Sequence, residues 1–185
     1  IAGLGCVAAA LFLVRVPMVG ADPGGLLLAD PLTHCVQLIL LALTLLTVVL
    51  SAEADFTDHV GEYFTLLLLA AAGMLFMAGA GDILMVFLAM ELTSLSLYSL
   101  TALNKASAAG TEAALKYFFF GAMAAAFALF GFSLLYGLTG STSLAGIAAG
   151  LSGRGFDPLL AVAVVMVLIG FGFKVAAVPF HLWAP

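Results

Sequence analysis

The chain has 185 residues, of which 65% are hydrophobic and only 8% are charged, and its formal net charge is −5. Soluble domains carry about 25% charged residues, and a soluble fold of this size has too little interior to bury so much apolar surface. Composition therefore excludes a soluble domain and indicates a polytopic membrane protein, all-α because open strands leave backbone groups unsatisfied in lipid. The acidic balance, without a basic tract, argues against nucleic acid as a partner.

Six apolar runs are each close to the ~20 residues that a helix needs to cross a bilayer. We therefore predict a single transmembrane domain of six spanning helices, joined by loops that hold the turn formers and most charges. A short surface helix is expected in residues 140–153, between the last two runs. The six runs are Ala2–Val19, Pro31–Leu50, Tyr63–Ala80, Ile83–Leu103, Ala113–Leu138 and Pro158–Trp183.

Helix-start and turn signals agree with these runs. The pairs 30–31 and 157–158 each place a capping aspartate before a proline at the first helical position. Thr111 and Glu112 supply a capping hydroxyl and an acid near the positive end of the fifth helix. The stretch "AGAGD", residues 78–82, predicts a tight glycine turn between the third and fourth helices.

The two ends of the sequence and its cysteines carry less information. The chain starts at Ile1 without a signal-peptide pattern and stops at Pro185 after an apolar run, so we expect a fragment of a longer protein. Cys6 and Cys35 lie in separate runs without metal-ligand spacing, which predicts two buried thiols rather than a disulfide or metal pair. Basic residues divide evenly between the two faces, so the positive-inside rule gives no orientation.

Sorting the charged residues by depth isolates three of them. Glu91 lies near the middle of the fourth helix and Lys174 lies deep in the sixth, while Lys116 is one to two turns inside the fifth. A charge at the centre of a membrane helix costs about 2.5–3.5 kcal/mol and faces the protein interior or a wet cavity. One interpretation is a buried pair that pins two helices, although such a pair is weak evidence for stability. The other is an ion or proton path.

Neighbouring residues favour a path. Ser94 and Tyr98 share a helical face with Glu91, and this hydroxyl stripe suits a hydrogen-bond chain, although hydroxyls also join helices in membranes. Pro179 leaves a carbonyl unpaired, which predicts a kink or break beside Lys174 of the kind that marks ion sites in transporters. His181 is a candidate proton relay or an interfacial histidine.

Three phrases make the chain resemble the antiporter-like membrane subunits of respiratory complex I. They are "ELTSLSLY" at 91–98, "EAALKYF" at 112–118 and "FKVAAVPFHLWAP" at 173–185. The last two favour the subunit N group of NADH–quinone oxidoreductase over its sister subunits L and M and over multisubunit cation/proton antiporters. The similarity covers most of the chain and is strongest from about Gly81 onward, while Ile1–Glu62 matches only in general pattern.

The resemblance implies a fourteen-helix fold with inverted five-helix repeats, of which this chain holds the second to seventh helices and, in residues 81–185, part of the first proton half-channel. It implies that Glu91, Lys116 and Lys174 translocate protons and that His181 follows a helix break. It places the loop between the fourth and fifth helices in the cytoplasm and the protein in the bacterial inner membrane. The lysines of the eighth and twelfth helices lie beyond this chain.

The resemblance also implies that this chain binds no cofactor or metal. NADH, FMN, iron–sulfur clusters and quinone would bind partner subunits, and subunits M and K would be its membrane neighbours. The expected function is proton translocation driven by quinone reduction elsewhere in the complex. Two alternatives remain open: a Na⁺ or K⁺/H⁺ antiporter subunit, which sodium-dependent activity would favour, and a structural membrane subunit whose buried charges hold helices together.

Overall fold

The structure, a computed structural model, describes residues 1–15, 20–21, 25–52, 59–153, 155, 157–178 and 180. Within these residues the chain is almost entirely helical, with one small antiparallel ribbon, β1 (Gly20–Ala21) and β2 (Leu28–Ala29), in the first loop. The helices are α1 (Ala2–Arg15), α2 (Pro31–Ser51), α3 (Val60–Ala78), α4 (Ile83–Thr101), α5 (Ala108–Thr139), α6 (Leu144–Leu151) and α7 (Pro158–Lys174).

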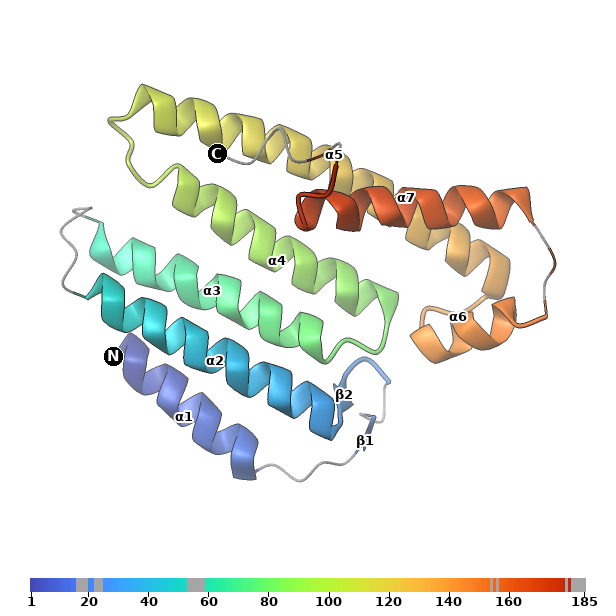
Figure 1. Ribbon diagram of the computed structural model, residues 1–185, viewed down its shortest axis with the longest axis horizontal. Coiled ribbons are helices and arrows are strands. Elements are labelled where there is room, and N and C mark those ends of the chain that lie inside the picture. Colours follow the sequence, from blue (N-terminus) through green and yellow to red (C-terminus); the bar gives the residue numbers. More distant parts are fainter. Residues whose placement is uncertain are drawn as a thin grey trace.

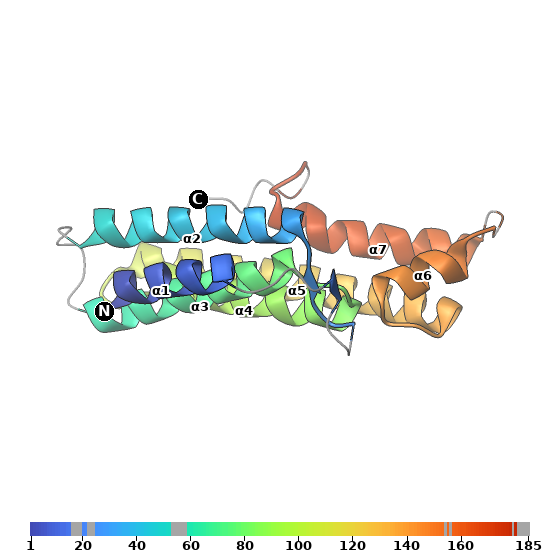
Figure 2. The same cartoon turned by 90° about the horizontal axis from the view of Figure 1, so that it is seen from below.

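Helices α1 to α5 lie side by side in sequence order, and α7 crosses the C-terminal half of α5 (Figure 1). Seen after a quarter turn, α2 and α7 form one layer, and α3, α4 and α5 form the other (Figure 2). In that view the first turns of α2 point toward the last turns of α7. In Figure 1 the same two ends lie apart, with α3 and α4 between them, so α2 and α7 flank α3 and α4 and do not meet.

Four of the described helices, α2 to α5, are long and apolar enough to cross a membrane. Helices α1 and α7 are equally apolar but shorter, at 14 and 17 residues. The prediction of a polytopic all-α bundle is confirmed, as is the short helix α6 within residues 140–153. Helix α7 ends at Lys174, inside the sixth predicted run, of which residues 179 and 181–183 lie outside the described residues.

The N-terminal caps were predicted correctly except at α5. Asp30 Oδ1 accepts a hydrogen bond of 2.6 Å from the Thr33 N–H, and Asp157 caps α7 in the same way. The expected start of α5 at Thr111 is wrong. The helix begins earlier, at Ala108, because Ser107 Oγ accepts a hydrogen bond of 3.0 Å from the Gly110 N–H. Apolar patterning missed this first turn since it is small and polar.

The predicted glycine turn at residues 79–82 ties three loops together at one end of the bundle. The Gly81 N–H donates to the Leu26 carbonyl, and the Gly81 carbonyl accepts from the Leu144 N–H, each over 2.9 Å. A Cβ atom on Gly81 would lie 2.7 Å from the Gly25 carbonyl oxygen, so a larger residue cannot occupy the turn. The first, third and fifth loops therefore share one face of the bundle, as alternating spans require.

Small residues let the helix backbones approach closely at two crossings. In the α3–α4 pair, a Cβ on Gly73 would lie 2.9 Å from the Ala89 carbonyl oxygen. In the α5–α7 pair, a Cβ on Gly131 would lie 2.8 Å from the carbonyl oxygen of Ala163, which is itself fully buried. Such contacts are the usual means of helix association in lipid, where the hydrophobic effect gives no driving force between helices.

The two cysteines differ in exposure. Cys6 is buried against the rest of the chain and Cys35 is exposed, and both are free thiols. The prediction of two buried thiols is therefore wrong for Cys35. Depth along a helix, which the sequence gives, does not say whether a side chain faces a neighbouring helix or the outer surface of the bundle.

Candidate functional site

One face of α4 carries the polar side chains that the sequence singled out. Glu91, Ser94 and Tyr98 follow each other along this face, where Ser94 and Tyr98 are buried and Glu91 is half-buried. Thr101 follows on the same face, one turn beyond Tyr98, and its hydroxyl donates to the Leu97 carbonyl of its own helix.

Helix α7 ends on the lysine itself. The Ala177 N–H donates to the Gly172 carbonyl over 2.9 Å, and the Ala176 N–H donates to the Phe173 carbonyl over 3.1 Å. This is the Schellman pattern of helix termination, and it places Ala176 in the left-handed region at φ 49°. The break expected beside Lys174 is confirmed, while Pro179, which predicted it, lies outside the described residues.

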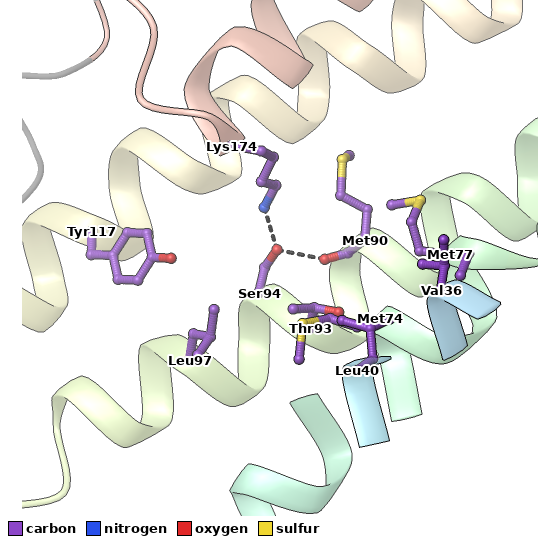
Figure 3. A pocket seen from close by; sticks show the side chains of 11 residues that line it. Val36, Leu40, Met74, Met77, Met90, Thr93, Ser94, Leu97, Tyr117 and Lys174 are labelled. Carbon is purple, nitrogen blue, oxygen red and sulfur yellow. Dashed lines mark hydrogen bonds between the residues drawn. The ribbon is translucent and has the colours of Figure 1, made fainter. Parts of the chain in front are cut away.

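The break directs Lys174 toward α4. Its ammonium donates a hydrogen bond to the Ser94 hydroxyl, and that hydroxyl donates in turn to the Met90 carbonyl over 2.5 Å (Figure 3). The two side chains are 80 positions apart in the sequence. An ammonium near the C-terminus of its own helix is also stabilised by the helix dipole.

A cavity of about 370 Å³ opens beside this contact. Lys174 and Ser94 lie on its wall, and Tyr117 faces it from α5 (Figure 3). The rest of the lining comes from α2, α3 and α4 and is mainly apolar. These residues are Val36, Leu40, Met74, Met77, Ala78, Met90, Thr93 and Leu97. The cavity therefore lies over α3 and α4, between side chains of α2 on one side and Lys174 of α7 on the other.

Aromatic rings surround the ammonium on the side toward α5. Lys174 Nζ lies 5.9 Å from the centre of the Tyr98 ring and 5.8 Å from that of Phe173, within the range of cation–π attraction. Tyr98 packs edge-to-face on Tyr117, with ring centres 4.6 Å apart, and on Phe118 at 5.8 Å. Tyr117 and Phe118 were not among the predicted site residues, since this cluster depends on which helices are neighbours.

Glu91 completes the site without touching the lysine. Its Oε1 atom is buried and has no hydrogen-bond partner among the described residues. Glu91 and Lys174 form no direct ion pair, yet the two charges are close enough to interact electrostatically. A carboxylate on the same face of α4 as the hydroxyl that binds an amine of α7 is a suitable arrangement for passing a proton.

Lys116 is not part of this group. Its side chain is 63% exposed on the outer surface of α5 and pairs with Glu112, one turn earlier, over 2.5 Å. The expectation that Lys116 is buried is therefore wrong for this chain. The residue lies too near the start of the long helix α5, on a face that no other described helix covers. His181 lies outside the described residues.

A further group of titratable side chains is exposed, where Glu62 pairs with His59 at 3.3 Å and with Lys105 at 3.6 Å. His34 on α2 is buried, and its Nδ1 atom pairs with the Asp30 carbonyl at 3.0 Å. Among the described residues, no three His, Cys, Asp or Glu side chains lie close enough together to hold a metal ion. Within the described chain, Glu91, Ser94 and Lys174 form the best-defined polar site at membrane depth.

The comparison with known families agrees with this geometry. The family model described as "NADH:quinone oxidoreductase/Mrp antiporter, TM" matches residues 80–185, which include both α4 and α7. The chain belongs to this family. The matched region begins at the glycine turn before α4, where the resemblance of the sequence also becomes strong.

Relatives in the family extend the match to the whole chain. "NADH-quinone oxidoreductase subunit N 2" of Acidobacterium capsulatum is 50% identical over 97% of this chain and 37% of the relative. "F(420)H(2) dehydrogenase subunit N" of Methanosarcina mazei is 41% identical over 84% of this chain and 32% of the relative. The chain therefore spans only about a third of the length of these relatives.

Solved structures of the family share the fold. A chain of respiratory complex I from Thermus thermophilus matches with a TM-score of 0.80 at 37% identity, covering 100% of this chain and 40% of that one. A chain of the Mrp complex from Dietzia sp. DQ12-45-1b matches with a TM-score of 0.72 at 25% identity, covering 98% of this chain and 35% of that one. The prediction of an antiporter-like membrane fold is confirmed.

Proposed function

We propose that this chain is part of a proton-translocating membrane subunit of a NADH–quinone oxidoreductase. Protons would pass between Glu91 and Lys174 by way of Ser94, with Tyr98 belonging to the same site. The observation that carries the proposal is the hydrogen bond from the Lys174 ammonium to the Ser94 hydroxyl, made beside a cavity at membrane depth. Charged groups at that depth are costly and typically mark ion or proton pathways.

The chemistry follows from the setting of the lysine. An ammonium and a neutral amine differ by one proton, and the Ser94 hydroxyl both accepts from Lys174 and donates to a backbone carbonyl. Glu91 supplies the opposite charge at the start of the same helix face. A conformational or electrostatic change that alters this charge balance would alter which side of the membrane exchanges protons with Lys174. Residues 81–185 would form part of the first proton half-channel.

Lys116 and His181 would extend the route. Lys116, exposed on α5, would connect the site to a part of the protein beyond this chain. Electron transfer would occur in partner subunits that hold FMN, iron–sulfur clusters and quinone, and membrane subunits such as M and K would flank this one in the bacterial inner membrane. Support comes from the name of the relative that is 50% identical, a subunit of a NADH–quinone oxidoreductase.

The test places Lys174→Met and Lys174→Arg in the full-length chain within its assembled complex. We expect both to lower proton pumping at least about tenfold, because methionine holds no proton and arginine does not release one. Glu91→Gln should act in the same direction. Lys105→Met and Glu62→Gln, which alter an exposed pair on the surface, serve as matched controls. Full pumping by Lys174→Arg would show that the charge only holds helices together.

A second function, a Na⁺ or K⁺/H⁺ antiporter subunit, is favoured by one finding, the likeness to the Mrp complex. The two functions share the fold and differ in the coupling ion. Proton pumping by inverted vesicles, measured with and without Na⁺ and K⁺ while quinone is reduced, separates them. Pumping that needs neither ion supports the first function, and strict dependence on either supports the second.

A further inference from the structure

Tyr98 occupies a notch that exists because residue 121 is glycine. A Cβ atom built on Gly121 would overlap the Tyr98 hydroxyl oxygen and lie 2.6 Å from Tyr98 Cζ, so the hydroxyl end of the ring lies against the backbone of α5. Tyr98 is only 7% exposed there. Any residue other than glycine at position 121 would displace the ring of Tyr98 from its present place.

The seated ring forms one wall of the space that the lysine ammonium occupies. Lys174 Nζ lies 5.9 Å from its centre, and the Tyr117 ring supports it from behind with an edge-to-face contact. The hydroxyl that holds Lys174 belongs to Ser94, one turn before Tyr98 on the same helix. A displaced ring would therefore remove a wall of the ammonium site and leave the hydrogen bond without lateral support.

We propose that the ring of Tyr98, seated in the Gly121 notch, is a positioning element that holds the Lys174 ammonium on Ser94. The proposal rests on the proton-translocating function given above and adds Gly121 as a residue that determines it. Tyr98 acts through the face of its ring and not through proton transfer by its hydroxyl. The hydroxyl oxygen is buried and interacts with Ser94 on the same face of α4, so Tyr98→Phe removes that interaction while it keeps the ring.

Two substitutions of Tyr98 distinguish the contribution of its ring from that of its hydroxyl. Tyr98→Phe keeps the aromatic face and loses the hydroxyl, whereas Tyr98→Leu loses both. If the ring positions Lys174, Tyr98→Leu lowers pumping by about threefold or more relative to Tyr98→Phe, the scale of a lost cation–π contact. A proton relay through the hydroxyl would make the two variants equally poor.

The notch is tested by Gly121→Ala alone and combined with Tyr98→Leu. Alone it should lower pumping as far as Tyr98→Leu does, because the new methyl group displaces the ring. Combined with Tyr98→Leu it should cause no further loss, since the group it displaces is gone. Gly137→Ala, on the same helix, is the matched control, because a Cβ there meets nothing within 4 Å.

Every measurement uses the full-length chain in its assembled complex, with subunit content determined for each variant. If Gly121→Ala fails to assemble, the comparison of Tyr98→Phe with Tyr98→Leu still decides. If Lys174→Met abolishes pumping but Tyr98→Leu pumps as well as the wild type, the positioning role of Tyr98 is overturned and the proposed function stands. Normal pumping by Lys174→Met instead overturns the proposed function, whatever the Tyr98 variants do.

Discussion

Gly170 and Ala128 meet where α7 crosses α5, with no room for a side chain between them. A Cβ on Gly170 would lie 2.5 Å from the Ala128 Cβ and 3.1 Å from the Ala124 carbonyl oxygen. Ala128 is fully buried. Gly170 also precedes Lys174 by one helical turn, so this crossing sets the distance from the lysine to the helices below it.

Gly170→Ala is therefore expected to destabilise the bundle although alanine is the better helix former. Overpacking at a close crossing costs about 1–3 kcal/mol, while the gain in helix propensity is at most about 1 kcal/mol. The melting temperature of the full-length protein in detergent should fall. Gly137→Ala is the control and should raise it, because that position is open. A higher melting temperature for Gly170→Ala would show that the crossing is looser than described.

At the end of α7 an exchange of alanine for glycine is expected to stabilise the protein. Ala176 adopts φ 49°, a left-handed conformation that costs an L-residue other than glycine about 1–2 kcal/mol. Ala176→Gly should therefore stabilise the protein by about 1 kcal/mol without moving the break. In the control, Ala122→Gly in exposed mid-helix α5 should destabilise it by about 0.5–1 kcal/mol. A loss of stability in Ala176→Gly would contradict the cap.

The sequence predicted the helices because lipid leaves little choice. Runs of apolar residues at membrane length, capping aspartates and a glycine turn each act locally, so Pro31–Ser51 and Ile83–Thr101 were predicted to within two residues. The α7 break was also predicted, since Pro179 cannot continue a helix. The start of α5 was missed because its cap, Ser107, comes before apolar patterning begins.

The sequence predicted how deep in the membrane the site residues lie, but not in which direction their side chains point. Counting residues placed Glu91 and Lys174 at membrane depth, and both face the bundle interior. The same counting predicted that Lys116 is buried, but its side chain is exposed. Depth along a helix does not say which face of the helix is covered by its neighbours. The Gly121 notch could not be foreseen, since it depends on how closely α4 and α5 approach.

Lys116→Met tests whether an exposed lysine of α5 contributes to proton pumping. Because Lys116 and Glu112 form an exposed pair within one helix, the substitution should leave the melting temperature and assembly unchanged. We expect proton pumping to fall because Lys116 extends the proposed route, but less than half as far as in Lys174→Met, since Lys116 does not contact Ser94 or the cavity. A fall as large as that of Lys174→Met would place Lys116 in the same rate-limiting step.

Acid should weaken the start of α2 through Asp30. The hydrogen bond from the Thr33 N–H holds the pKa of the Asp30 carboxyl below its ordinary value of 3.8. Because the folded-state pKa is the lower one, the stabilising effect is fully present above about pH 4 and is lost as pH falls through the folded value. Asp30→Asn keeps a capping side chain that does not titrate. The melting temperature of the wild type minus that of Asp30→Asn should therefore be positive at pH 6 and shrink below pH 4. A difference that stays constant down to pH 3 would show that the carboxylate of Asp30 does not stabilise α2.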